Sequence, residues 1–167
     1  MSLDPQPNQE PAVRAYVKLI RTAESLHNRI SRGLISEGLT ASQFSAMKVL
    51  RIHGALPQKD IAKYLIQTGG NITLVVDNLE RNLLCKRVRD KEDRRMIFVT
   101  LTQKGEELFD RIYPAHLERI RQAMKALSVE SLEQLIACTD KLDPSDIDIC
   151  TPLENIKRPE SELAQLN

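Results

Sequence analysis

The chain has 167 residues, of which 41% are hydrophobic and 28% charged, a composition that excludes a mainly disordered chain and predicts one globular domain. No apolar run approaches the ~20 residues of a membrane-spanning helix, and the N-terminus lacks a signal-peptide pattern, so we expect a cytoplasmic protein with no membrane partner. The net charge of +1 conceals 21 basic and 14 acidic side chains in residues 1–127 against 3 and 9 in residues 128–167, and such a basic body favours a polyanionic partner.

The first part of the chain predicts two helices after a flexible arm over residues 1–10. Apolar side chains recur at steps of three and four over residues 12–34, which is typical of a long amphipathic helix. Thr40 and Gln43 have the spacing of a capping box. A second helix is therefore expected to begin there and to end at His53, before Gly54.

The middle of the chain predicts two short helices and a hairpin. A helix follows Pro57 to about Ile66, and a tight turn with two glycines leads into another helix from Asn71. The apolar residues of this second helix share one face, with the spacing i, i+3, i+4, i+7 and i+11: Ile72, Val75, Val76, Leu79 and Leu83. Residues 85–101 alternate as strands do around a charged tip, which predicts a β-hairpin.

The last part of the chain predicts two more helices and a tail. Thr102 is expected to cap a long helix in which Pro114 predicts a kink or a break. Its predicted inward residues are Leu108, Ile112, Tyr113, His116, Leu117, Ile120, Ala123 and Leu127. Ser128 is expected to cap a final helix that carries inward Leu132, Leu135, Ile136, Cys138, Thr139 and Leu142. Residues 143–167 are expected to form an acidic tail.

The order of short helix, tight turn, capped helix and hairpin is that of a winged helix-turn-helix. We therefore expect a mainly α fold with a small β-hairpin wing. The polar face of the second helix of this unit is free to enter a DNA major groove, and its glycines bring backbone amides close to phosphates. The candidate DNA contacts on this face are Thr68, Gly69, Gly70, Asn71, Thr73, Leu74 and Asp77. A merely solvated polar face is the other interpretation.

The hairpin tip supplies a second set of candidate DNA contacts, Asp93, Arg94 and Arg95. An arginine there can enter a narrow A·T-rich minor groove, whose negative potential attracts a guanidinium. Asp93 would be an odd choice beside phosphates unless it orients Arg95 through a salt bridge. The alternative is a solvated tip whose charges neutralise one another.

The stretch of residues 68–108, TGGNITLVVDNLERNLLCKRVRDKEDRRMIFVTLTQKGEEL, resembles the MarR family of winged helix-turn-helix regulators, and the likeness extends over residues 11–142. Its most specific elements are the run of residues 93–95 and Leu101-Thr102 followed by Gly105. The sequence departs from the family pattern at Leu83, where the family usually has glycine, and at Cys85.

The resemblance implies a homodimeric regulator that binds double-stranded DNA at a pseudo-palindromic operator. Residues 40–102 would form the DNA-binding part, with residues 69–84 as recognition helix, and residues 11–36 and 103–142 would form the dimerisation helices. Repression relieved by a ligand is typical of the family. The alternative function is that of a winged-helix adaptor or dimerisation module that binds a protein partner and no longer binds DNA.

Two signals that would release the protein from DNA are compatible with the sequence. In the family, small aromatic or phenolic molecules often occupy a cleft between the dimerisation helices and the winged domain, for which the candidate lining residues are His27, Phe44, Met47, His53 and Tyr113. Ordinary packing is the other interpretation of each. An oxidant is the second candidate signal, because Cys85 lies beside Lys86 and Arg87. No catalytic, cofactor or metal motif is recognisable, so we expect no enzyme activity, cofactor or metal.

Overall fold

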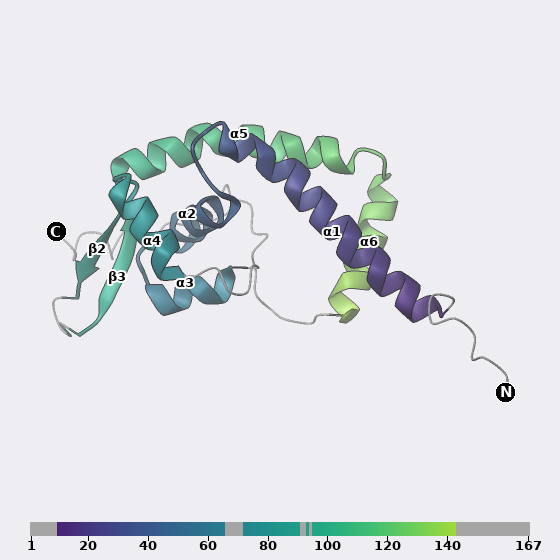
Figure 1. Cartoon of the computed structure of the whole chain (residues 1–167), viewed down its shortest axis with the longest axis horizontal. Helices are drawn as coiled ribbons and strands as arrows, with labels where there is room; N and C mark the ends of the chain where they lie inside the picture. Colours follow the sequence, from purple (N-terminus) through teal and green to yellow (C-terminus); the bar gives the residue numbers. More distant parts are fainter. Residues whose placement is uncertain (1–9, 66–71, 91–92, 94, 143–167) are drawn as a thin grey trace.

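A computed structural model describes residues 10–65, 72–90, 93 and 95–142. The described chain is mainly helical with a small β-hairpin, as the sequence predicts, and the hairpin belongs to an antiparallel sheet in the order β1-β3-β2 (Figure 1). In chain order the elements are α1 (Pro11–Ile35), α2 (Ala41–His53), β1 (Leu56–Pro57), α3 (Gln58–Tyr64), α4 (Ile72–Arg81), β2 (Cys85–Arg89), β3 (Ile97–Leu101), α5 (Gln103–Met124) and α6 (Val129–Leu142).

The predicted capping box at the start of α2 is confirmed. The Thr40 hydroxyl oxygen accepts a hydrogen bond from the backbone N–H of Gln43 at 3.2 Å. In return, the side-chain oxygen of Gln43 accepts from the backbone N–H of Thr40 at 2.8 Å. At the other end Gly54 has a φ of 74°, a conformation that favours glycine and ends the helix. These local signals therefore fix both ends of α2.

The sheet contains the predicted hairpin and one strand that the sequence does not indicate. β2 pairs with β3 in an antiparallel register that runs from Cys85 opposite Leu101 to Arg89 opposite Ile97. The additional strand, β1, pairs Leu56 with Val99 on the other side of β3. A two-residue strand is too short for an alternating pattern, and Pro57 is tolerated because the strand lies at the sheet edge.

The core of the described chain is centred on α2, which packs against α1, α3, α4, α5 and β3. Its largest fully buried side chains come from seven elements, α1 to α5 together with β2 and β3: Leu34, Met47, Ile61, Val76, Leu79, Cys85, Val99 and Phe109. Phe44 stacks on Phe109, with 5.2 Å between the ring centroids. This core fixes the hairpin and the two short helices as one unit.

The two terminal helices leave apolar faces uncovered. α6 has no buried residue, and Ile136 is 52% exposed. The prediction that Leu135, Ile136, Cys138, Thr139 and Leu142 point inward is therefore wrong for a single chain. The reason is physical, because an amphipathic pattern marks a face that needs cover without saying which chain provides it. The same holds for Leu127, which lies three residues beyond the end of α5, and Tyr16, Val17 and Ile20 on α1 are exposed too.

The longest helix after α1 is α5, which runs from Thr102, its capping residue, through Pro114 without interruption. Of the predicted kink or break at Pro114, the break is therefore wrong. Proline removes a single hydrogen-bond donor, and the helix packs against α1, α2 and β3, so tertiary contacts hold its turns together. The helix passes over the winged part and reaches the region of α1 and α6 (Figure 1).

Candidate nucleic-acid interface

Helix α4 divides into a buried face and an exposed face. Val75, Val76 and Leu79 are buried in the core. Two of the predicted contacts, Thr73 and Leu74, are exposed on the other side, and Leu74 is 56% exposed although it is apolar. The helix therefore offers one free surface. The predicted contacts Thr68, Gly69, Gly70, Asn71 and Arg94 lie outside the described residues.

The end of α4 is a Schellman motif built on Leu83. The backbone N–H of Leu83 donates to the carbonyl of Glu80, and that of Leu84 donates to the carbonyl of Leu79, both at 2.9 Å. Leu83 has a φ of 59°, in the left-handed region that normally holds glycine. At this position, where the sequence departs from the family pattern, a leucine therefore adopts a backbone conformation that normally requires glycine.

The start of α5 holds this helix end in place. The Thr102 hydroxyl donates to the carbonyl of Leu83 at 2.7 Å, and its backbone N–H donates to the carbonyl of Leu84 at 3.1 Å. The Lys104 ammonium donates to the carbonyl of Asn82 at 2.9 Å. These bonds satisfy carbonyls left open at the end of α4, so the long helix and the exposed helix are joined directly.

A polar cluster joins the exposed face of α4 to the wing and to α3. The guanidinium of Arg87, on β2, donates to the carboxylate of Asp77 at 2.6 Å and also to that of Glu80. It reaches the side-chain oxygen of Gln58 at 3.2 Å. The amide nitrogen of Gln58 in turn donates to the Thr73 hydroxyl oxygen at 2.8 Å. Two of the predicted contacts, Thr73 and Asp77, thus have partners within the protein.

The wing tip holds Arg95 outward through Asp93. One carboxylate oxygen of Asp93 accepts from the backbone N–H of Arg95 at 3.0 Å and from its Nε at 3.1 Å. These hydrogen bonds, the side-chain one first, lower the pKa of Asp93 below its usual value. The Arg95 side chain is nevertheless 91% exposed. The salt bridge that the sequence suggests between Asp93 and Arg95 is therefore present, and Lys86 and Arg89 add exposed positive charge on β2.

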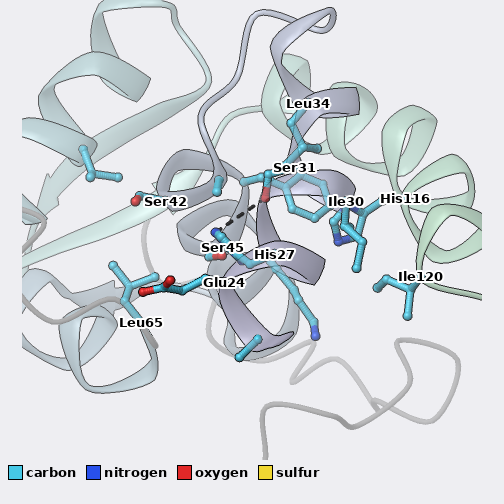
Figure 2. Close-up of a pocket in the computed structure, with 15 residues that line it drawn as sticks. Glu24, His27, Ile30, Ser31, Leu34, Ser42, Ser45, Leu65, His116 and Ile120 are labelled. Carbon is cyan, nitrogen blue, oxygen red and sulfur yellow. Dashed lines mark hydrogen bonds between the residues drawn. The ribbon is translucent and has the colours of Figure 1, made fainter. Parts of the chain in front are cut away.

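A pocket of about 520 Å³ lies between α1, α2 and α5 (Figure 2). Two of the predicted lining residues, His27 and Phe44, line it. The other three do not: Met47 is fully buried in the core, the ring of His53 stacks on Tyr64 at 4.5 Å, and Tyr113 stacks on Phe109 at 5.1 Å. The wall is mainly apolar, and its polar residues are Glu24, His27, Ser31, Ser42, Ser45, Lys48 and His116.

His116 is the main pocket residue that sequence reasoning missed. The periodicity predicts it only as an inward residue of the long helix, although a histidine on an apolar face is itself a signal. Its ring lies 4.5 Å from that of Phe44, and its buried Nδ1 has no hydrogen-bond partner among the described residues. Burial first, and then the charges of Arg119, Lys48 and His27, lower the pKa of His116 to about 4. The imidazole is therefore neutral at pH 7.

Cys85 lies in an environment that does not favour reaction with oxidants. The thiol is buried, and its sulfur lies 3.6 Å from the carbonyl oxygen of Val76. Burial first, and then the charge of Glu80, raise the pKa of Cys85 to about 11. The thiolate is the reactive form, so the positively charged neighbours in the sequence do not activate this cysteine.

The described part of the chain shows neither a membrane-spanning helix nor a metal-binding cluster. No helix within it is long and apolar enough to cross a membrane. No group of three or more histidine, cysteine, aspartate or glutamate side chains in the same residues is arranged to hold a metal ion.

The family model that matches this chain is that of the MarR family, over residues 39–97. The chain is 33% identical to the HTH-type transcriptional regulator YkoM of Bacillus subtilis over 132 residues. This alignment covers 79% of this chain and 86% of YkoM. The chain is also 30% identical to the HTH-type transcriptional regulator MhqR of the same organism, in an alignment that covers 80% of this chain and 90% of MhqR. Among solved structures, the S. aureus MepR-DNA complex has a TM-score of 0.68 and 29% identity, and covers 76% of this chain and 95% of that one. The likeness to these relatives thus extends well beyond residues 39–97.

Proposed function

Because this chain belongs to the MarR family of DNA-binding transcriptional regulators, we propose that it acts as a homodimeric, sequence-specific repressor on a pseudo-palindromic operator. Two-fold symmetry in the protein would be matched by two half-sites about one helical turn of DNA apart. Residues 40–102 would form the DNA-binding part. Residues 11–36 and 103–142 would form the dimerisation part, and residues 143–167 an acidic tail.

The wing tip is the observation that carries the DNA-binding part of the proposal. Arg95 is oriented by Asp93 and is still almost fully exposed. A guanidinium positioned in this way is ready to enter a minor groove, where narrow A·T-rich sequences attract it. The free face of α4 would enter the adjacent major groove, with Thr73 and Leu74 close to base edges and thymine methyl groups. Asn71, which directly precedes α4 in the sequence, would be a further base contact.

The homodimer is supported by apolar surface at the far end of the molecule from the wing. Residues on α1 and α6 are exposed although they are large and hydrophobic: Tyr16, Val17, Ile20, Val129, Ile136 and Leu142. Monomeric proteins rarely leave contiguous apolar surface of this kind in water. A second copy of the chain would cover it and would set the distance between the two α4 helices.

A small aromatic or phenolic ligand in the pocket would act as the signal. The pocket touches α1 and α5 as well as α2 and Val75 of α4, so its occupation would bias the position of the winged part relative to the dimerisation helices. A ligand that binds better to a conformation in which the two α4 helices of the dimer do not match the DNA half-sites lowers the affinity for DNA. The loss equals the difference between the ligand's binding energies in the two conformations, typically ~1–3 kcal/mol. The burial of the Cys85 thiol and its raised pKa favour this signal over oxidation of Cys85.

Fluorescence anisotropy tests the proposal with duplexes from the promoter beside the gene of this protein, in a series of salt concentrations. We expect binding that falls steeply as salt rises, because lysine and arginine release counterions from phosphates. Arg95→Ala should weaken binding most at A·T-rich flanks, and Asn71→Ala should reduce discrimination at particular base pairs by ~1–3 kcal/mol. The control is Arg51→Gln, which removes an ion pair with Asp110 of α5.

The same titration distinguishes the proposed repressor from the alternative, a winged-helix adaptor. An adaptor that binds a protein partner would show weak binding without sequence preference. If Arg95→Ala, Asn71→Ala and the parent protein bind every duplex equally, the assignment of the wing and of the recognition helix is wrong.

A further inference from the structure

The side-chain amide of Gln58 links two residues of the candidate interface. Its nitrogen donates to the Thr73 hydroxyl oxygen at 2.8 Å, and its oxygen accepts from the Arg87 guanidinium at 3.2 Å. Because arginine can only donate, the amide oxygen must face Arg87, which leaves the amide nitrogen for Thr73. The orientation of the amide is therefore determined by its partners.

Arg87 is itself held firmly within the protein. Its guanidinium contacts the carboxylates of Asp77 and Glu80, and the carboxylate of Glu80 also accepts from the backbone N–H of Arg87 at 3.1 Å. Two negative charges thus surround one positive charge, whereas Lys86 and Arg89 on the same strand are exposed. Arg87 is a structural link between β2 and α4 and is not available to a phosphate.

Gln58 also has a rigid base. It is the first residue of α3 and directly follows Pro57, which pairs with Phe98 of β3. The amide therefore extends from the sheet to the exposed face of α4 and joins it at Thr73. A threonine without such a bond samples more than one χ1 rotamer in a helix, because its hydroxyl can turn to different acceptors.

We propose that Gln58 and Arg87 are positioning residues that determine base specificity through Thr73. This rests on the proposed function, in which α4 enters the major groove. Gln58 holds the hydroxyl and the methyl group of Thr73 in one arrangement, and Arg87 holds Gln58. A side chain that is fixed before binding discriminates between bases better than one that must be ordered on binding. None of the contacts that carry this role involves DNA directly.

The test uses Gln58→Met, which keeps the side-chain length and removes both hydrogen bonds, together with Thr73→Val and the double variant. The probe is a duplex that the parent protein selects from a random library, and a set of duplexes with each base pair replaced in turn. Gln58→Met and Thr73→Val should each reduce discrimination about 3- to 10-fold at the same base pairs. The double variant should lose no more than either single variant, since both remove one link. The salt dependence should stay unchanged, because every phosphate contact is retained.

Arg87→Lys provides a second, independent measurement. Lysine keeps the charge but cannot contact two carboxylates and an amide oxygen at once, so this variant should lose discrimination at the base pairs affected by Gln58→Met. Arg51→Gln is the matched control, since Arg51 makes two hydrogen bonds to one carboxylate between α2 and α5; it should change neither discrimination nor salt dependence. Thermal melts followed by circular dichroism confirm the fold, and Gln58→Ala replaces Gln58→Met if the latter is unstable.

Three results would overturn the inference. Discrimination could change in Thr73→Val and not in either Gln58 variant, the losses could be additive, or Arg87→Lys could bind like the parent. In each of these cases the parent still binds DNA and the proposed function stands. If the parent selects no duplex from the library, the proposed function and the inference fail together.

Discussion

The backbone carbonyl group of Leu84 lies against the position that a Cβ atom on Gly105 would occupy, with its carbon 2.9 Å away and its oxygen closer still. Gly105 is in the first turn of α5, and Leu84 follows the end of α4. The nearest atoms all belong to the backbone of Leu84, so the neighbour cannot move aside as a side chain would. Glycine at this position is therefore required by the close approach of two backbones.

Gly105→Ala should destabilise the protein by about 2–3 kcal/mol, because the methyl group must displace the backbone at the end of α4. Chemical denaturation measures the loss. Gly38→Ala is the control: Gly38 has a φ of 77° with nothing within 4 Å of its Cβ position, so it should cost only about 1 kcal/mol of backbone strain. Equal losses in the two variants would show that the contact with Leu84 is not responsible.

Replacement of Leu83 by glycine should stabilise the protein. Leu83 has a φ of 59° and its side chain is 66% exposed, so the change relieves backbone strain and gives up little buried surface. The gain should be about 0.5–1 kcal/mol after the greater flexibility of glycine in the unfolded chain is subtracted. Leu83→Ala keeps the Cβ atom and should bring no gain in the same denaturation experiment. A gain from alanine as large as that from glycine would contradict this explanation.

His116 should make stability depend on pH in a defined window. Its pKa is about 4 in the folded chain against an ordinary 6.5, so between these values the unfolded chain binds a proton that the folded chain does not. Unfolding is therefore favoured as the pH falls from 6.5 towards 4. Since the imidazole is partly exposed, we expect a loss on the order of 1–2 kcal/mol. His116→Gln should flatten the pH profile, and an unchanged profile would show that His116 is not its source.

The cysteines should differ in reactivity. A variant that keeps only Cys85 should not react with a thiol reagent until the protein is unfolded, because the thiol is buried and its pKa is raised to about 11. A variant that keeps only Cys138, which is exposed, should react at once. Peroxide should leave DNA binding of the first variant unchanged. Rapid labelling of native Cys85 would restore oxidation as a candidate signal.

Ile136→Asp should shift the protein from dimer to monomer in sedimentation experiments, because a charge would be buried in the proposed interface. Leu74→Asp is the matched control, since Leu74 is similarly exposed but lies on α4. It should alter DNA binding and leave the oligomeric state unchanged. A monomeric parent protein would contradict the proposed dimer.

The sequence predicts those features that depend on neighbouring residues. The capping box of Thr40 and Gln43 and the alternating strands of the hairpin belong to this class, and the structure confirms them. The apolar face of α4 is confirmed for Val75, Val76 and Leu79. The prediction is wrong for Leu83, which lies beyond the end of α4 and is 66% exposed, because the left-handed backbone there ends the helical periodicity. The ion pair between Asp93 and Arg95 is also local, because its two partners are only two positions apart in the chain.

Other features depend on residues that the fold brings together. Nothing in the sequence relates Gln58 to Thr73 or places His116 beside Phe44. The strand β1 exists only because β3 offers it an edge. Likewise, periodicity predicts that one face of α6 needs cover but does not place that cover in another chain.

The direct junction between α4 and α5 has a mechanical consequence. At 1.5 Å per residue the 22-residue α5 is roughly 33 Å long, and hydrogen bonds from Thr102 and Lys104 hold its first turn to the end of α4. A tilt of α5 by about 5° displaces one of its ends relative to the other by about 3 Å. The end of α4, the helix that we propose reads DNA, is bonded to one of these ends and would move with it. A shift of that size approaches the 3.4 Å rise between successive base pairs in B-form DNA.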